Sequence, residues 1–221
     1  MRGWFEPMTP RPRALLFDWD NTLIDSWPCL GRASNITLAA MGHATWSEAE
    51  VRSRIAGSLR DTFPRIFGDR WEEAREVYYR AFEQVHLEML RVFPGAAEFL
   101  HAAAQAGLYA AVVSNKTGKY LRAEAAYLGW DPLFSRLVGA QDAMRDKPEI
   151  DPVLMALEPS GLKPAPDVWL IGDNAIDVAC ARNAGCTAVL MHEPVAAGSP
   201  PPDIAAADFA TLARIIGIAM A

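Results

Sequence analysis

The apolar residues of this chain are grouped in short runs without polar interruptions, and amphipathic stretches separate these runs. Runs that are apolar on both faces and alternate with helices are typical of a parallel sheet with helices on both sides. We interpret as strands the runs at residues 14–17, 109–114, 136–140, 168–172 and 186–191. Helical patterns lie near residues 95–106, 117–128, 150–158, 174–184 and 208–220. The pattern therefore predicts an α/β fold with a doubly wound parallel sheet.

Residues 27–92 interrupt this alternation, because they contain only helical patterns and no strand-like run. The helical stretches lie near residues 28–41, 47–56, 59–67 and 70–91. Ser47 and Glu50 have the spacing of a capping box at the second of these stretches. The sequence thus predicts a core domain of residues 1–26 and 93–221 with an inserted helical domain of residues 27–92.

Composition narrows the class of protein. A chain of 221 residues with an apolar share of 51% has room for a well-filled core and is not disordered. The net charge of −6 argues against nucleic acid as the main partner, and no apolar run approaches the roughly 20 residues of a membrane span. Cys29, Cys180 and Cys186 lack metal-ligand spacing, so we expect buried thiols in a cytoplasmic protein. The first residues lack the apolar core of a signal peptide, and translation starts at Met1 or Met8.

Asp18 and Asp20 follow the first predicted strand, in the segment ALLFDWDNTLIDS. Because side chains alternate along a strand, the two carboxylates leave on one side and Trp19 leaves on the other. Neighbouring carboxylates repel each other unless a cation or a shared proton relieves them, which points to a nucleophile beside an acid or base. A strand that runs into an Asp-rich turn would account for this segment equally well.

Further polar residues follow the later predicted strands. These residues are Ser114, Asn115, Lys147, Asp173 and Asp177. Ligands of open α/β sheets bind beyond the carboxyl ends of the strands, so we expect these residues at one rim with the first two aspartates. Carboxylates hold Mg²⁺, while hydroxyl and ammonium groups hold phosphate oxygens, so the set fits phosphoryl transfer. A turn, a helix cap or a surface lysine would explain each residue alone, but their joint occurrence at strand ends favours a site.

Two Lys-Pro pairs compete for the role of the lysine in this site. Lys163 precedes the strand at residues 168–172, which places it on the order of 15 Å from the carboxyl ends of the strands. Lys147 follows its strand and is therefore on the correct side of the sheet, so it is the better candidate.

Residues 13–195 resemble the haloacid dehalogenase superfamily of phosphatases, because four motifs occur in the order of that family. DWDNT matches the DxDxT motif, VVSN ends in the family's serine position, DKP supplies the lysine, and GDNAID supplies an acidic pair. The resemblance implies a Rossmann-like core, and the helical insert matches the family's cap domain between the first and second motifs. Within the family the arrangement is most similar to the phosphoglycolate phosphatases. One departure is Asn21, where many members have glycine.

The resemblance also implies a reaction. Asp18 would be the nucleophile and Asp20 the general acid and base in the Mg²⁺-dependent hydrolysis of a small phosphorylated metabolite, through an aspartyl-phosphate. Ser114, Asn115 and Lys147 would bind the phosphate group.

The same resemblance implies the ligands of the metal. Asp18, the backbone carbonyl of Asp20 and Asp173 would hold Mg²⁺. Asp177 would lie next to the metal or act through a water molecule. The metal would let an anionic carboxylate approach an anionic phosphate.

The cap narrows the activity further. Residues 25–93 contain no lysine, which disfavours the phosphonatases and mutases of this family that use a cap lysine. Dehalogenases normally lack an aspartate at the position of Asp20, so this residue favours a phosphate ester. Arg54 and Arg60 could contact an anionic group of the substrate, although surface arginines are the simpler interpretation.

Several alternatives remain open at this point. A nucleotide 5′-phosphatase or a sugar phosphatase would use the same chemistry, and a catalytically inactive regulatory binding protein would keep the same fold. The intact set of Asp18, Asp20, Ser114, Lys147 and Asp173 argues against the inactive protein. The sequence leaves open the substrate and the cap residues that select it, and it fits a monomer or a homodimer.

Overall fold

The computed structural model describes residues 10–55, 59–192 and 200–220, with the side chains of residues 59–61 outside the description. The chain divides into two compact units. The core unit consists of Met1–Ile24 and Val92–Ala221, and the cap unit consists of Asp25–Arg91. The sequence pattern predicts these two boundaries after residue 26 and after residue 92.

The core unit is built on a parallel sheet, which has six strands in the described ranges. The strands are β1 (Ala14–Phe17), β2 (Tyr109–Thr117), β3 (Arg136–Ala140), β4 (Val168–Gly172), β5 (Thr187–Met191) and β6 (Ile204–Ala206). Their order is β3-β2-β1-β4-β5-β6, and every pair is parallel. The first strand is therefore central, with Ala14 aligned to Tyr109 on one side and to Val168 on the other. This order is the doubly wound Rossmann-like arrangement, which confirms the predicted fold class.

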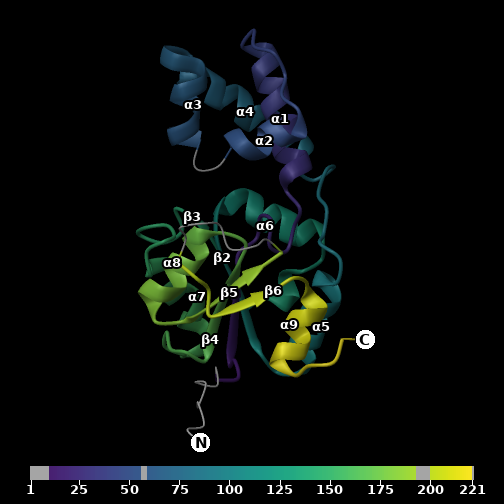
Figure 1. The fold of residues 1–221 in the computed structure, drawn as a ribbon, viewed down its shortest axis with the longest axis vertical. Coiled ribbons are helices and arrows are strands. Elements are labelled where there is room, and N and C mark those ends of the chain that lie inside the picture. Colours follow the sequence, from purple (N-terminus) through teal and green to yellow (C-terminus); the bar gives the residue numbers. More distant parts are fainter. Residues whose placement is uncertain (1–9, 56–58, 193–199, 221) are drawn as a thin grey trace, which may run out of the picture. The chain divides into compact units, whose positions relative to one another are not determined.

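Helices cover both faces of this sheet (Figure 1). On one face lie α5 (Ala96–Gln105), α6 (Gly118–Tyr127) and α9 (Phe209–Ile216). On the other face lie α7 (Asp151–Leu157) and α8 (Ala175–Ala184). Short 3-10 turns η2 (Asp131–Leu133) and η3 (Glu158–Ser160) follow α6 and α7. Within the described ranges, none of the helices combines the length and the apolarity of a membrane span.

Strand β1 is buried on both faces, which explains why its sequence is apolar without alternation. Ala14 and Leu16 belong to a core cluster with residues of α7 and α8. Phe17 faces the opposite side and makes edge-to-face contacts with Phe99 and Phe134. Burial of each large apolar side chain contributes about 1.5–3 kcal/mol, so the strand that leads into Asp18 is rigidly held.

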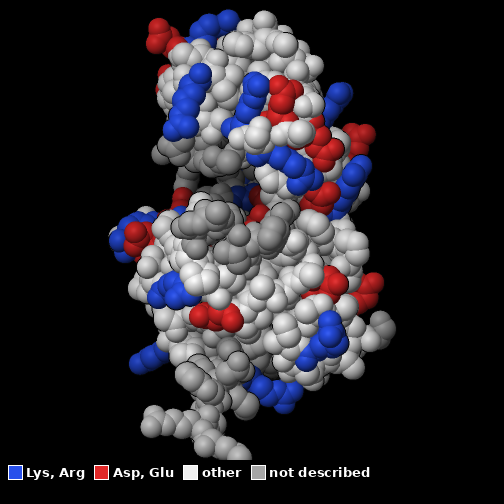
Figure 2. Space-filling view, viewed as in Figure 1, with Lys and Arg blue, Asp and Glu red and all other residues white. Residues whose placement is uncertain are grey.

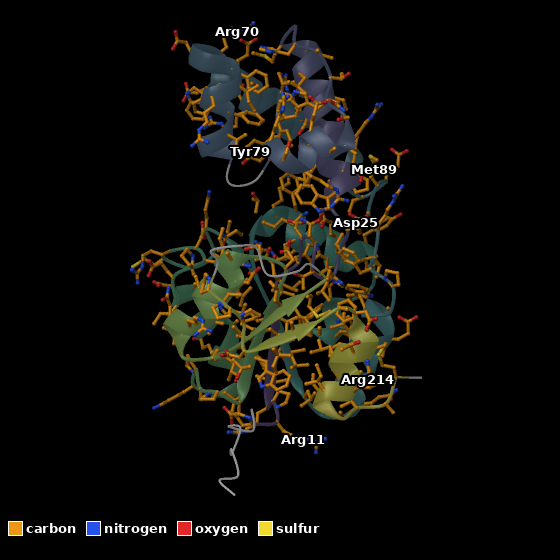
Figure 3. The ribbon with its side chains drawn as sticks, in the orientation of Figure 1. Arg11, Asp25, Arg70, Tyr79, Met89 and Arg214 are labelled. Carbon is orange, nitrogen blue, oxygen red and sulfur yellow. The ribbon has the colours of Figure 1, made fainter. Side chains whose placement is uncertain are left out.

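Helix α9 ends earlier than the predicted range of 208–220. It stops at Ile216 because Gly217 adopts a φ of +79°, the left-handed conformation that ends a helix. The guanidinium of Arg11, labelled in Figure 3, donates hydrogen bonds to the carbonyl groups of Ile216 and Gly217. A cation from the start of the described chain thus stabilises the carboxyl end of its last helix.

The cap unit is helical, as its sequence pattern indicates. Its helices are α1 (Trp27–Ala40), α2 (Glu48–Arg54), α3 (Leu59–Phe67) and α4 (Trp71–Val85), with the 3-10 turn η1 (Gly68–Arg70) before α4. Helix α1 packs mainly against α4. The capping box at α2 is confirmed, since Ser47 Oγ accepts from Glu50 N–H and Ser47 N–H donates to the Glu50 carboxylate at 2.9 Å.

Helix α4 ends at Val85, although the sequence pattern predicts a helix to residue 91. Residues 86–89 form a hydrogen-bonded turn, in which the Met89 N–H donates to the Val85 carbonyl at 2.9 Å, and the residues after this turn pair with the segment at residues 24–25. Asp25, labelled in Figure 3, donates its N–H to the Arg91 carbonyl at 2.8 Å. Ile24 and Val92 form an antiparallel bridge within the core unit. Tertiary pairing of the two connecting segments thus overrides the local helical pattern.

Candidate active site

The site begins where β1 ends. Asp18 continues the pairing of β1 with β4, because its N–H donates to the Ile171 carbonyl at 2.8 Å. The chain then turns through Asn21, which adopts a φ of +59°. Asparagine tolerates this left-handed conformation better than most residues, which accounts for its presence at this turn. Trp19 packs against Trp130 on the face opposite the site.

Lys147 joins two of the predicted carboxylates. Its Nζ lies 2.8 Å from Asp18 Oδ1 and 2.6 Å from Asp177 Oδ1, and its side chain is only 3% exposed. Burial acts to lower the pKa of Lys147, but the charges of Asp177 and Asp18 outweigh burial and raise that pKa above its ordinary value. The ammonium group therefore stays charged throughout the physiological range. Lys163 is exposed and precedes β4, so it lies away from this group.

Asn115 holds the backbone of the loop that carries Lys147. Its amide Nδ2 donates to the Lys147 carbonyl at 3.0 Å, and its Oδ1 accepts from the Lys147 N–H at 3.0 Å. This reciprocal pair fixes the lysine relative to the end of β2. A contact between Asn115 and phosphate stays a prediction, because the Asn115 side chain is hydrogen-bonded to the backbone of Lys147 in this structure.

Ser114 lies at the end of the buried part of β2. It is 4% exposed, and its Oγ accepts a hydrogen bond from the N–H of Lys116 at 3.2 Å. A hydroxyl that accepts one bond keeps its proton for donation to a second partner. Ser114 is thus suited to donate to a phosphate oxygen, and this role stays a prediction.

The end of β4 supplies the remaining acids, Asp173 and Asp177. Asn174 caps α8 with a capping box, in which Asp177 Oδ2 accepts the N–H of Asn174 at 3.2 Å. The other oxygen of Asp177 binds Lys147. Gly172 makes this arrangement possible, since a Cβ there would lie 2.1 Å from Asp177 Cγ.

Three carboxylates gather at this edge of the sheet. Asp18, Asp173 and Asp177 each offer an oxygen, and these oxygens lie within 4.8 Å of one another. Burial raises the pKa of Asp18 to about 6, with the charge of Asp177 adding to the effect and that of Lys147 opposing it. Burial also raises the pKa of Asp173 to about 8, together with the charges of Asp18 and Asp177. An acidic group of oxygen donors with one lysine fits a hard cation such as Mg²⁺.

The predicted set of metal ligands overlaps with this cluster without being identical to it. Asp18 and Asp173 belong to both. Asp177, predicted to lie next to the metal, is a member of the cluster, but both of its oxygens have protein partners. The carboxylate of Asp20 is not a member, and the predicted contribution of its backbone carbonyl stays a prediction.

Without metal, the protein is expected to lose stability as the pH rises from about 4 to about 8. The pKa of Asp18 and that of Asp173 are higher in the folded protein than their usual value of 3.8. In this window the folded state therefore binds more protons than the unfolded state, and ionisation destabilises it. Each pKa unit corresponds to about 1.4 kcal/mol, so the loss amounts to several kcal/mol. Thermal unfolding with a chelator present, measured across this window, checks the expectation.

Two controls accompany that measurement. Mg²⁺ binds the ionised carboxylates of the folded state, so an excess of it should flatten the pH dependence. Asp173→Asn removes the carboxylate whose pKa is raised most, so this variant should show a weaker pH dependence in the chelator. A melting temperature of the metal-free protein that rises with pH would contradict the electrostatic description of the cluster.

Asp20 is paired with Lys116, whereas Asp18 is paired with Lys147. Lys116 Nζ lies 2.8 Å from Asp20 Oδ1 and 3.0 Å from Glu124 Oε1. Neither Lys116 nor Glu124 is among the residues that the sequence motifs predict for the site. The spacing of the sequence could have indicated Lys116 as a residue of the site. It comes two residues after Ser114, and in an extended segment side chains two residues apart point to the same side. No comparable pattern marks Glu124.

The cap residues Arg54 and Arg60 remain predictions. Arg54 is paired with Glu50 at 3.0 Å, and its guanidinium lies 5.0 Å from the ring centre of Trp46. It borders a cleft of about 710 Å³ within the cap unit. Arg60 belongs to α3, but its side chain lies outside the described residues.

Comparison with known proteins agrees with this geometry. The family model of haloacid dehalogenase-like hydrolases matches residues 15–191. A phosphoglycolate phosphatase from Xylella fastidiosa is 32% identical over 178 residues, which cover 79% of this chain and 77% of the relative. An N-acetylmuramic acid 6-phosphate phosphatase from Pseudomonas aeruginosa is 30% identical over 180 residues, which cover 79% of each chain. The crystal structure of a predicted phosphoglycolate phosphatase from Haemophilus somnus has a TM-score of 0.83 and 25% identity, covering 93% of this chain and 98% of that one.

The range matched by the family model runs from β1 to the end of β5. It therefore contains every strand that carries a residue of the site. Both of the sequence relatives named above are phosphatases. These matches show that the chain belongs to the haloacid dehalogenase-like hydrolases and is a phosphoric monoester hydrolase among them.

Proposed function

We propose that this enzyme is a Mg²⁺-dependent phosphatase that hydrolyses a small, phosphoglycolate-like monoester through an aspartyl-phosphate. The observation that carries the proposal is the buried Asp18, whose carboxylate lies 2.8 Å from Lys147 and beside Asp173 and Asp177. Such a carboxylate has a fixed orientation and a neighbouring cation, which a nucleophile that attacks an anionic phosphate requires.

In the first step of the proposed reaction, an oxygen of Asp18 attacks phosphorus, and the bond from phosphorus to the ester oxygen breaks. Protonated Asp20 donates its proton to the departing alkoxide, so the alcohol leaves in neutral form. Ser114 and Lys147 hold the phosphate oxygens during this transfer.

In the second step, ionised Asp20 accepts a proton from a water molecule that attacks the aspartyl-phosphate. Inorganic phosphate leaves, Asp18 regains its carboxylate, and Asp20 is protonated for the next cycle. Asp18, the backbone carbonyl of Asp20 and Asp173 would hold Mg²⁺, with Asp177 adjacent to them. When bound, Mg²⁺ supplies positive charge that reduces the repulsion between the attacking carboxylate and the phosphate.

The proposed substrate is a small phosphorylated metabolite rather than a polyanion. On the face that Figure 2 shows, Lys and Arg side chains are interspersed with Asp and Glu, and the formal net charge of the chain is −6. Relatives named as phosphoglycolate phosphatases favour a small acid, and the N-acetylmuramic acid 6-phosphate phosphatase favours a sugar phosphate as the second candidate.

We place the enzyme in the cytoplasm as part of the same proposal, acting as a monomer or a homodimer without nucleic acid or membrane partners.

Phosphate release from a panel of monoesters tests this proposal. The panel contains phosphoglycolate, N-acetylmuramic acid 6-phosphate, other sugar phosphates, nucleoside 5′-monophosphates and p-nitrophenyl phosphate, each assayed with Mg²⁺ and with a chelator. We expect turnover that requires Mg²⁺, with the highest kcat/KM for phosphoglycolate. A preference for a sugar phosphate or a nucleotide would support one of the alternative substrates. A folded protein that binds Mg²⁺ and hydrolyses none of these esters would contradict the proposal and favour a binding role.

A further inference from the structure

Lys116 occupies a position that the proposed reaction does not yet use. It follows Ser114 and Asn115 in β2, and its side chain is only 6% exposed. Its ammonium group lies between Asp20 Oδ1 at 2.8 Å and Glu124 Oε1 at 3.0 Å. A lysine with carboxylates on both sides has little freedom to change its rotamer, so its position is well defined.

Glu124 has a second hydrogen-bonding partner besides Lys116, which fixes its position. It belongs to α6, its side chain is 1% exposed, and its Oε2 accepts a hydrogen bond from the indole N–H of Trp19 at 2.7 Å. Trp19 is fully buried and packs edge-to-face against Trp130, with a distance of 5.8 Å between ring centres. A continuous chain of contacts therefore runs from the core through Glu124 and Lys116 to Asp20.

The connected polar side chains of Trp19, Glu124, Lys116 and Asp20, here called the Lys116 network, are unusual for a group that serves stability alone. Burial of a carboxylate is unfavourable even when it is paired, and an apolar side chain of similar volume often gives equal or greater stability. Trp19 also lies between Asp18 and Asp20 in the sequence, so the network contacts the catalytic segment from both of its faces. Each aspartate has its own lysine, since Lys147 binds Asp18 and Lys116 binds Asp20.

We propose that Lys116 is a positioning residue, which holds the Asp20 carboxylate in the orientation for proton transfer and is itself held by Glu124. The inference rests on the proposed function, because it assigns Lys116 a role through the general acid and base. Asp20 has to deliver a proton to the ester oxygen and later take one from water, and both transfers require a fixed distance and angle. A contact to Oδ1 restricts rotation of the carboxylate about its terminal bond.

The leaving group of the substrate distinguishes this role from a structural one. An alkoxide needs a proton in order to leave, whereas p-nitrophenolate leaves without one. The ratio kcat/KM covers the steps up to alcohol release, so it reports the acid role of Asp20 and excludes the later attack of water. A positioning residue for Asp20 should therefore affect alkyl esters more than p-nitrophenyl phosphate.

The experiment compares Lys116→Met with the wild type on the preferred alkyl ester and on p-nitrophenyl phosphate. We expect kcat/KM to fall about 100-fold for the alkyl ester and less than about 10-fold for p-nitrophenyl phosphate, with Mg²⁺ affinity retained. Lys163→Met is the matched control, because Lys163 is exposed at the opposite ends of the strands, and it should leave both values unchanged.

Glu124→Gln provides a second variant of similar volume, which removes the negative charge beside Lys116 and leaves one acceptor oxygen in place of two. It should show the same contrast between the two esters at smaller magnitude, and it serves as the test if Lys116→Met does not fold. Equal losses on both esters in the folded variants, or unchanged kinetics, would overturn the positioning role. A wild type that hydrolyses no ester would instead contradict the proposed function, so the two failures are distinguishable.

Discussion

An Asp18→Asn variant is expected to lose phosphate release by about four to six orders of magnitude while it keeps its fold. The amide of asparagine is neutral and does not form the acyl-phosphate that the proposed reaction needs. The fold should tolerate the change, because burial already disfavours the ionised form of Asp18 and raises its pKa to about 6. Lys147 also keeps its contact with Asp177 at 2.6 Å. Phosphate release and thermal unfolding of the same preparation measure the two effects separately.

Asp20→Asn is the matched control for this prediction. It keeps the nucleophile but lacks the base that activates water, so the phosphorylated form should accumulate when p-nitrophenyl phosphate is the substrate. The intact mass of the protein should then increase by one phosphoryl group in the Asp20 variant and stay unchanged in the Asp18 variant. A phosphoryl group attached to the Asp18→Asn protein would show that another residue is the nucleophile.

Lys147→Met is expected to affect both activity and stability. Loss of the only cation within 4.0 Å of Asp18 among the described residues should lower kcat/KM by about 100- to 1,000-fold or more. It also leaves buried carboxylates without their partner, which destabilises a protein by about 3–5 kcal/mol. For a chain of this size, that loss lowers the melting temperature by roughly 10 °C.

Two comparisons identify the cause of that loss. Mg²⁺ and a lower pH both reduce the charge of the acidic group, so each should recover part of the stability of Lys147→Met. Lys163→Met has the same change in composition at an exposed position, and it should change the free energy of unfolding by less than about 0.5 kcal/mol. If Lys147→Met were as stable as the wild type in a chelator at neutral pH, the electrostatic account of this lysine would be wrong.

The sequence is most informative where it contains an uninterrupted apolar run. The fully buried strands at residues 14–17 and 168–172 have the bounds that their apolar runs predict, and so does the partly buried edge strand at residues 136–140. Strand β6 was not predicted, because Ile204–Ala206 has only three residues and pairs with β5 alone at the edge of the sheet. A strand of this length carries no periodic pattern, so its formation depends on the neighbour that it meets in the fold.

The sequence predicts which residues gather at the site, but it does not predict all of the contacts that they make. Strand ends and motif order suffice to bring Asp18, Lys147 and the two acids of the β4 end into one group. They do not reveal that Asn115 binds the backbone of Lys147, since an asparagine at a strand end has many possible partners. Glu124 illustrates the same limit, because a glutamate inside a helical pattern is normally exposed and only the tertiary structure shows it buried.

The central position of β1 has a consequence for how the protein is made. Among the described strands β1 is synthesised first, but one of its two neighbours, β4, starts only at Val168. The cap unit, Asp25–Arg91, is a continuous segment, and its helices α1 to α4 pack against one another. We therefore expect the nascent cap helices to pack while β1 still lacks β4, and the catalytic edge to assemble only after most of the chain has been synthesised. Until then the apolar segment ALLF lacks one of the two strands that bury it in the folded protein.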